Sequence, residues 1–122
     1  MTTHPAILFL DDDPTRGDSF LKRFPDTVWV TTAADCIEEL QKHSWPTVCL
    51  DHDLGGEVYV DSNREDCGME VVRWLENHDV SVGQIIIHSY NFYAVGIMKN
   101  VLVKAGYDAV RIPFADLIKM PK

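Results

Sequence analysis

Continuous apolar runs alternate with helix-like apolar stripes along the whole chain. A strand buried on both faces of a parallel sheet is continuously apolar, whereas an amphipathic helix repeats its apolar positions every three to four residues. The first run, residues 6–10, is bounded by Pro5 and by three aspartates. The pattern predicts strands over residues 6–10, 28–31, 47–50, 84–87 and 109–112.

Helical segments fill the intervals between these runs. Asp13 followed by Pro14 is typical of an N-cap with proline at the first helical position, and this helix is expected to end near Pro25. Thr32 with Asp35 three residues later resembles a capping box and opens a second helix. Further helices are expected around residues 71–75, over 92–105, and over 114–120 with about two turns.

Alternating strands and helices without an internal repeat predict an α/β fold in which helices cover both faces of a parallel sheet. At 122 residues the chain has room for one core, so we expect a single domain over residues 1–122. The natural arrangement is a flavodoxin-like three-layer sandwich with a five-stranded parallel sheet in the order 2-1-3-4-5. This order places the first and third strands side by side at the switch point, where ligands bind, and the fourth strand beside the third.

The composition is ordinary for a soluble globular protein, with 46% hydrophobic and 25% charged residues. The formal net charge of −8 argues against a nucleic-acid polymer or an anionic membrane as partner. A small nucleotide stays compatible with this charge, because a bound metal can invert the local field. The three cysteines show no paired metal spacing, no signal peptide is evident, and no apolar run approaches the ~20 residues of a membrane span. A cytoplasmic location is therefore expected.

Acidic residues follow the first and third expected strands. Asp11, Asp12 and Asp13 leave the first strand, and Asp51 and Asp53 leave the third. Because these strands are expected to be neighbours, the carboxylates converge at one edge of the sheet, where they require protonation or a cation. Oxygen-rich sites suit Mg²⁺, and we expect Asp11, Asp12 and Asp51 to hold it. The simpler alternative is a helix cap for Asp13 and solvated loop positions for the others.

Other polar residues flank the same acidic pocket. His52 follows the third strand, and His88, Ser89 and Asn91 follow the fourth. Each histidine is a candidate general acid or base near neutral pH. The alternatives are a structural hydrogen bond, or metal ligation, which would favour Mn²⁺ or another transition ion over Mg²⁺. Ser89 and Asn91 either bind phosphate oxygens or cap the fourth helix.

A long polar connection separates the third strand from the third helix. It opens with Gly55-Gly56, which either allow close backbone approach to a phosphate or form a flexible turn. The roughly fifteen residues that follow exceed the usual length of a βα connection. This length favours a lid or a substrate-binding role.

Several of these segments resemble the response-regulator receiver domain, and the resemblance covers nearly the whole chain. It implies that Asp11 and Asp12 form the acidic pair that holds Mg²⁺. It also implies that Asp51 is the phosphoacceptor and that Asp53 binds the metal through its carbonyl. The segments are Ile7-Leu8-Phe9-Leu10-Asp11-Asp12, Val48-Cys49-Leu50-Asp51 and Pro113-Phe114.

The chain departs from ordinary receivers where these read out the phosphoryl group. Receivers carry a lysine immediately before the proline that follows the fifth strand, whereas Ile112 stands there and Arg111 lies one residue early. Strand alternation would point Arg111 to the other face of the sheet unless a bulge re-aims it. The hydroxyl switch position of receivers falls on His88 or Ser89.

Two motifs are more similar to a divergent branch, the cyclic-phosphate processing receiver domains of prokaryotic and phage conflict systems. These motifs are Leu50-Asp51-His52-Asp53-Leu54-Gly55-Gly56 and His88-Ser89-Tyr90-Asn91. The leading hypothesis is a metal-dependent phosphodiesterase acting on a cyclic nucleotide or cyclic phosphate. In it the cation polarises the phosphoryl group and activates water, and His88 donates the proton to the leaving oxygen. His52 either assists or binds phosphate, and the other contacts to phosphate oxygens are expected from Ser89, Asn91 and Arg111.

Two other functions compete with this hypothesis. In the first, Asp51 is phosphorylated in a phosphorelay, or the domain only binds a partner protein. In the second, Asp11-Asp12-Asp13-Pro14-Thr15 fits the Asp-x-Asp-x-Thr signature of haloacid-dehalogenase-type phosphatases, in which the first aspartate is the nucleophile. The short chain argues against the second function, because it offers no obvious cap and no convincing lysine followed by a late acidic pair.

Overall fold

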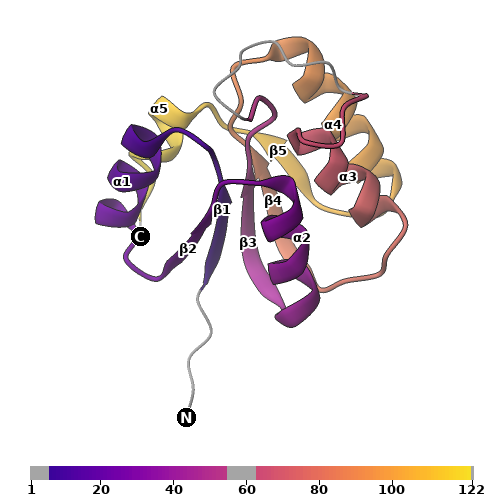
Figure 1. The fold of residues 1–122 in the computed structure, drawn as a ribbon, viewed down its shortest axis with the longest axis horizontal. Helices are drawn as coiled ribbons and strands as arrows, with labels where there is room; N and C mark the ends of the chain where they lie inside the picture. The colour runs from indigo at the N-terminus through magenta and orange to yellow at the C-terminus, as the bar shows by residue number, and fades with distance from the viewer. Residues whose placement is uncertain (1–5, 55–62, 122) are drawn as a thin grey trace.

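The computed structural model describes residues 6–54 and 63–121 of the chain. Its strands form one parallel sheet in the order β2-β1-β3-β4-β5 (Figure 1), which confirms the expected flavodoxin-like topology. The strands run parallel because the chain returns through a helix to the end of the sheet at which each strand begins. The strands are β1 (Ile7–Leu10), β2 (Thr27–Val30), β3 (Trp45–Leu50), β4 (Val82–Ile87) and β5 (Ala109–Arg111).

Helices cover both faces of this sheet and complete the three layers (Figure 1). The first and last helices pack on one face, where Phe20 and Leu117 join a small core cluster around Phe9. The other three pack on the opposite face and contribute to the larger cluster. None of the helices in the described ranges is both long and apolar enough to cross a bilayer. The helices are α1 (Pro14–Arg23), α2 (Ala33–Lys42), α3 (Gly68–Glu76), α4 (Phe92–Lys104) and α5 (Phe114–Leu117).

Among the element boundaries that differ from the sequence-based expectation, two have a clear physical reason. The strand β3 begins at Trp45 rather than at residue 47, because the Trp45 side chain is buried and the residue pairs with Val82 of β4. The helix α5 has four residues instead of about two turns. Pro121 follows closely, and a proline disfavours helical conformation in the residue before it.

The register of the central strands brings three polar residues to one edge of the sheet. Leu10 of β1 pairs with Leu50 of β3, and Leu50 pairs with Ile87 of β4. The next residues along these strands are Asp11, Asp51 and His88. The ladder extends through them, because the Asp51 amide donates to the Leu10 carbonyl (3.1 Å) and the His88 amide donates to the Leu50 carbonyl (3.0 Å). The backbone therefore holds all three residues in fixed relative positions.

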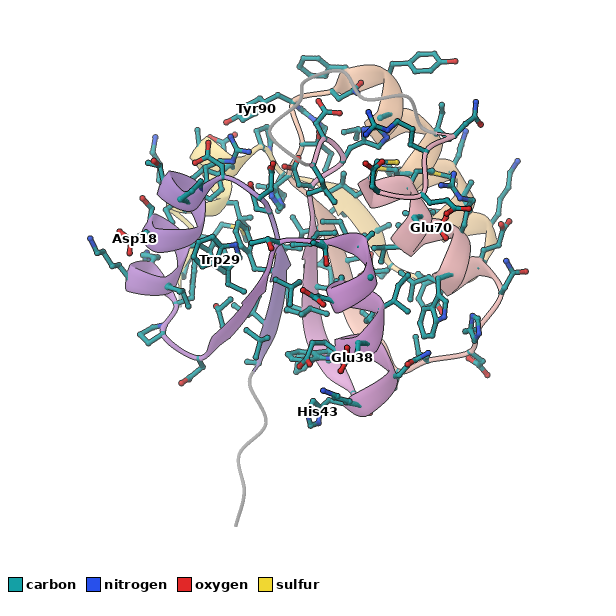
Figure 2. All side chains as sticks on the ribbon, in the orientation of Figure 1. Asp18, Trp29, Glu38, His43, Glu70 and Tyr90 are labelled. Atoms are coloured by element: carbon teal, nitrogen blue, oxygen red, sulfur yellow. The ribbon has the colours of Figure 1, made fainter. Side chains whose placement is uncertain are left out.

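Two glycines allow close packing around this edge. A Cβ atom on Gly17 of α1 would overlap the indole of Trp29, which lies between α1 and the sheet (Figure 2). A Cβ atom on Gly68 would overlap the carbonyl oxygen of Asp51. The Gly68 amide also donates to the His52 carbonyl at 2.9 Å. The start of α3 is thus placed directly against the backbone that carries Asp51.

We expect Gly68→Ala to lower the free energy of unfolding by about 1–3 kcal/mol, because the added methyl group meets backbone atoms that cannot move aside cheaply. Gly96→Ala is the matched control, since Gly96 lies in α4 with nothing within 4 Å of the added Cβ. Its expected effect is a gain of about 0.5–1 kcal/mol from helix propensity. Urea unfolding followed by circular dichroism measures both variants. Equal effects of the two substitutions would contradict the close approach at Gly68.

Candidate functional site

The sheet edge assembles two carboxylates and an imidazole that are separated widely in the sequence. Asp11, Asp51 and His88 each offer a ligand atom, and these atoms lie within 4.8 Å of one another. All three side chains are buried, with exposed fractions of 0%, 5% and 1%. The His88 Nε2 atom lies 3.0 Å from Asp11 Oδ2. Of the two candidates for the receiver switch position, His88 is therefore the residue that faces the acidic pair.

Arg16 supplies the nearest positive charge, and the sequence-based reasoning did not identify it. Its Nε donates to Asp11 Oδ2 at 2.8 Å, and its Nη2 donates to Asp11 Oδ1 at 2.9 Å. The same Nη2 lies 3.4 Å from Asp51 Oδ2, and Nη1 lies 3.3 Å from Asp13 Oδ2. A signal was present, because a cation in the first turn of a helix opposes the helix dipole and calls for a carboxylate partner.

The two buried carboxylates experience different electrostatic environments. Burial raises the pKa of Asp11, but hydrogen bonds from His88 and Arg16 outweigh burial and hold that pKa below its usual value. Burial raises the pKa of Asp51 to about 6, although the nearby His88 and Arg16 lower it in part. Asp51 therefore carries a charge near neutral pH that its surroundings compensate incompletely.

The His88 ring is fixed by packing on one side and by Asp11 on its edge. It stacks on Phe9 with ring centroids 4.8 Å apart and an interplanar angle of 13°. Because ionised Asp11 only accepts hydrogen bonds, Nε2 of His88 must carry the proton that the two share. The Nδ1 atom is buried and has no hydrogen-bond partner among the residues that the structure describes. This nitrogen is therefore left to accept or donate a proton elsewhere.

His52 is not part of this group and instead belongs to a second buried network. Its Nδ1 lies 2.8 Å from Asp53 Oδ1, and Asn91 Nδ2 donates to the same oxygen at 3.1 Å. Burial lowers the pKa of His52, but hydrogen bonds with Cys67 and Asp53 raise it above the usual value. For Cys67, burial raises the pKa, but the hydrogen bond with His52, together with the backbone amides of the first helical turn and the charge of His52, outweighs burial and lowers it. The network ties the start of α3 to the segment after β3.

Cys67 received no role from the sequence, because its partner His52 lies fifteen positions away and only the fold brings them together. Cys67 is the N-cap residue of α3. Amides of the first helical turn, those of Met69 and Glu70, also hydrogen-bond to its sulfur and lower its pKa. The two remaining cysteines, Cys36 and Cys49, are buried thiols whose pKa values are raised by burial.

Two polar residues that follow the strands act as helix caps, and a third hydrogen-bonds to the backbone of one of them. Asp13 caps α1, because its Oδ1 accepts from the amides of Thr15 (2.8 Å) and Arg16 (3.3 Å). Asn91 caps α4 in the same way, since its Oδ1 accepts from the Ala94 amide at 3.1 Å. Ser89 Oγ accepts from the Asn91 amide at 3.0 Å. Asp13 and Asn91 therefore make the capping contacts that the sequence left open, whereas Ser89 supports the backbone of the α4 cap.

Asp12 lies at the rim of the site rather than in the buried group. It lines a cavity of about 600 Å³ together with residues at the start of α2 and after β3. These lining residues are Thr31, Thr32, Ala33, Ala34, Leu54, Glu65 and Asp66. A cavity of similar size, about 590 Å³, lies at the opposite end of the sheet where β4 begins, and no predicted site residue lines it.

The structure does not bring Arg111 to the acidic group. Its guanidinium lies over the Phe92 ring, 4.3 Å from the centroid, and its buried Nε has no hydrogen-bond partner within the described ranges. Arg111 pairs with Ile87 of the larger core cluster, whereas its neighbours Val110 and Ile112 pack in the smaller cluster with Phe9. Strand alternation therefore directs it to the other face. Gly55 and Gly56 lie outside the described residues.

The donor set of Asp11, Asp51 and His88 suits a divalent cation. Carboxylates are ligands for Mg²⁺ and Mn²⁺, and an added imidazole favours Mn²⁺ or another transition ion. Arg16 brings a single positive charge to three carboxylates, those of Asp11, Asp13 and Asp51. A further positive charge at this edge would therefore be stabilised by the residues already present.

Comparisons with known proteins agree with this architecture. A family model described as "Cyclic-phosphate processing Receiver domain" matches residues 6–104. No curated protein matches the sequence significantly.

Solved structures similar to this chain include three receiver-like proteins. A sensor protein from Polaromonas sp. JS666 has a TM-score of 0.63 at 15% identity, covering 95% of this chain and 91% of that one. The non-phosphorylated HemR receiver domain from Leptospira biflexa has a TM-score of 0.63 at 15% identity over 97% of both chains. The Mn²⁺-bound form of the response regulator Rcp1 has a TM-score of 0.59 at 14% identity, covering 95% of this chain and 88% of that one. At these identities the likeness establishes the fold alone.

We expect Asp51→Asn to raise the free energy of unfolding of the metal-free protein by about 1–3 kcal/mol at pH 7.5. The pKa of Asp51 is raised to about 6 from an unperturbed 3.8, so the folded state binds its proton more tightly than the unfolded chain does. This carboxyl therefore contributes less stability as the pH rises from 3.8 through 6, and its full penalty applies above that range. The amide removes the buried charge and keeps an oxygen for the His52 amide.

Urea unfolding with a chelator present, at pH 7.5 and at pH 4, measures this difference. The advantage of Asp51→Asn should shrink at pH 4. Asp18→Asn is the control, because Asp18 points outward from α1 with 64% of its side chain exposed (Figure 2), and its effect should stay within about 0.5 kcal/mol. An Asp51→Asn variant that is less stable than wild type at pH 7.5 would show that Arg16 and His88 compensate the charge fully.

Proposed function

This chain belongs to the cyclic-phosphate processing receiver domain family, and from that premise we propose that it cleaves a cyclic phosphodiester with the help of a divalent cation. The observation that carries the proposal is the convergence of Asp11, Asp51 and His88 within 4.8 Å at the sheet edge. The proposed substrate is a small phosphorylated ligand, either a cyclic nucleotide or another cyclic phosphate.

Asp11 and Asp51 would hold Mg²⁺ or Mn²⁺ in this proposal, and Asp12 at the rim and the Asp53 carbonyl remain candidate further ligands. The related response regulator Rcp1 is described in a Mn²⁺-bound form, which supports cation binding by this fold. A divalent cation in such a site polarises a phosphoryl group and lowers the pKa of water that attacks it. The fixed register of β1 and β3 would keep the two carboxylates in place without reorganisation.

His88, once it carries a proton on Nδ1 as well as on Nε2, would donate the Nδ1 proton to the leaving oxygen and return to the neutral ring. Asp11 engages Nε2, and stacking on Phe9 prevents the ring from turning, so the other nitrogen is the one available for proton transfer. Cleavage of one P–O bond of the ring leaves an alkoxide oxygen, and proton donation from His88 would neutralise it. General acid–base help of this kind contributes about 10²–10⁴-fold in rate.

The cavity beside Asp12 offers room for the organic part of the substrate. Its volume of about 600 Å³ lies within the ~300–1,000 Å³ of ordinary small-molecule sites. Polar residues Thr31, Thr32, Glu65 and Asp66 are among those that line it, and the Asp66 carboxylate is also engaged by Arg64. These groups would hydrogen-bond to a sugar or to amino groups of a base, whereas they would repel a second phosphate.

In this proposal His52 positions Asp53 and Asn91 and does not donate a proton. It is fully buried and is engaged by Asp53 and Cys67. Asn91, which caps α4, and Ser89, which accepts from the Asn91 amide, would orient the same loop. The phosphate contact expected from Arg111 would instead be made by Arg16, because Arg16 lies beside the carboxylates.

A second function is phosphoacceptor signalling through Asp51. It is favoured by the position of Asp51 at the end of β3, in a fold similar to response-regulator receivers. It is disfavoured by Ile112, which packs in the apolar cluster with Phe9 at the position where receivers carry lysine. A haloacid-dehalogenase mechanism has less support, because its nucleophile would be Asp11, which is fully buried with both oxygens engaged.

We expect His88→Ala to lower turnover of a cyclic phosphate by about 10²–10⁴-fold in the presence of Mn²⁺, because proton donation to the leaving oxygen is lost. Cyclic nucleotides and a cyclic phosphate without a base are the substrates to screen, with Mg²⁺ and Mn²⁺ in parallel. His78→Ala is the matched control, since His78 is exposed at the opposite end of the sheet and lines only the far cavity. Turnover that is unchanged in His88→Ala would remove the role assigned to this residue.

We expect no covalent phosphoryl adduct on Asp51 when the protein is incubated with a small phosphodonor and Mg²⁺. Intact-protein mass spectrometry under acidic conditions detects such an adduct, and Asp51→Asn serves as the blank. A base-labile mass increase that disappears in Asp51→Asn, together with no hydrolysis of any cyclic phosphate, would establish the signalling function in place of the proposed one.

A further inference from the structure

Arg16 sits between the solvent and the buried carboxylates. Its side chain is 31% exposed, whereas Asp11 is completely buried beneath it. It is the third residue of α1, and its guanidinium turns back toward the end of β1 instead of extending along the helix. A cation that approaches Asp11 and Asp51 from the solvent therefore meets this guanidinium at the cluster.

The oxygens of Asp11 are fully occupied. Oδ1 accepts from the Asp13 amide (2.9 Å) and from Arg16 Nη2 (2.9 Å). Oδ2 accepts from Arg16 Nε (2.8 Å) and faces His88 Nε2 (3.0 Å). A carboxylate offers about four lone-pair positions, so Asp11 has none left for a metal ion while these contacts persist.

Of these three partners only Arg16 can leave without unfolding part of the site. The Asp13 amide belongs to the backbone that caps α1, and its own side chain is held by the cap. The His88 ring is buried and stacked on Phe9. Arg16 is joined to its helix by a long flexible side chain that is already partly in solvent.

We propose that Arg16 is the counter-ion of this cluster in the metal-free state. When a divalent cation binds, Arg16 releases Asp11 and Asp51 and then binds the phosphoryl oxygens of the substrate. A planar guanidinium forms paired hydrogen bonds with phosphate as readily as with carboxylate, so its released donors have a matching partner. The inference rests on the proposed function, because it assumes that the cluster takes a cation.

A purely structural role for Arg16 predicts the opposite sign. If Arg16 only clamps Asp11 and Asp51 in place, its removal loosens the two carboxylates and weakens cation binding. If Arg16 competes with the cation for the same oxygens, its removal strengthens cation binding. The sign of the change in affinity therefore separates the two roles without any measurement of catalysis.

Titration calorimetry with Mn²⁺ on wild type, Arg16→Gln and Arg23→Gln provides the test. We expect Arg16→Gln to bind Mn²⁺ at least about tenfold more tightly than wild type, and to bind inorganic phosphate at saturating Mn²⁺ at least about tenfold more weakly. Arg23→Gln is the matched control on the same helix, because the Arg23 hydrogen bonds seen in the described part of the chain go to the carbonyls of Ile118 (3.3 Å) and Met120 (2.7 Å), far from the cluster, and both affinities should stay unchanged. If Arg16→Gln fails to fold, Arg16→Lys replaces it with the same expected directions, since lysine cannot form the paired hydrogen bonds.

A second readout separates displacement from a simple loss of positive charge. In ¹⁵N-labelled wild type, the Arg16 Nε–H is held by Asp11 in the metal-free state. Addition of Mg²⁺ should shift this resonance and speed its exchange with solvent, while the Arg23 Nε–H should not respond.

The outcomes distinguish this inference from the proposed function. Cation binding by wild type, combined with unchanged or weaker binding by Arg16→Gln or with an undisturbed Arg16 Nε–H, would overturn the role of Arg16 and leave the metal site standing. Absence of Mn²⁺ and Mg²⁺ binding in wild type and in every variant would overturn both.

Discussion

Burial of two carboxylates at the ends of adjacent parallel strands is the constraint on which the rest of this structure depends. The pairing of Leu10 with Leu50 leaves Asp11 and Asp51 side by side, and neither can move without breaking the sheet ladder. Buried like charges raise each other's pKa unless cations or hydrogen-bond donors compensate them. The surrounding residues provide this compensation, but they compensate the two carboxylates unequally. Asp11 has the donors of Arg16, His88 and a backbone amide, whereas Asp51 keeps a pKa raised to about 6.

The source of positive charge also separates this chain from the ordinary receivers that it resembles. Those receivers bring a lysine from the end of the fifth strand, where Ile112 here fills an apolar cluster with Phe9. Here Arg16, in the first turn of α1, supplies the positive charge. His88, directly after β4, supplies an imidazole ring that hydrogen-bonds to Asp11. In this chain the cationic partner of the carboxylates therefore lies on a partly exposed helix rather than at the end of a strand. A charge on a flexible, partly exposed side chain can leave the carboxylates, which a clamp built into the sheet could not do.

The sequence predicts the elements of this site better than it predicts their contacts. Strand periodicity and βα alternation are local signals, and they were sufficient for the sheet order and for the meeting of Asp11, Asp51 and His88 at one edge. Contacts that depend on the direction of a long side chain were out of reach. Arg16 reads as an ordinary helix-surface residue until its position against the helix dipole is considered. Arg111 followed the rule of strand alternation and lies against Phe92 on the other face. The Cys67–His52 pair joins segments whose separation carries no periodic signal.

The site thus combines hydrogen bonds that are fixed with others that can be exchanged. Backbone amides, the His88–Phe9 stack and the His52–Asp53–Asn91 network fix the ligand atoms, because each lies in a buried and packed environment. In the role proposed for Arg16 its contacts are exchangeable, because the guanidinium reaches the cluster from a partly solvated position. A metal-dependent site needs both kinds. Without the fixed contacts the carboxylates would separate in the absence of a cation, and without an exchangeable counter-ion they would protonate or destabilise the fold. In the metal-free state Arg16 offsets the negative charge of the buried carboxylates. After the cation binds, Arg16 would instead bind the phosphate group of the substrate.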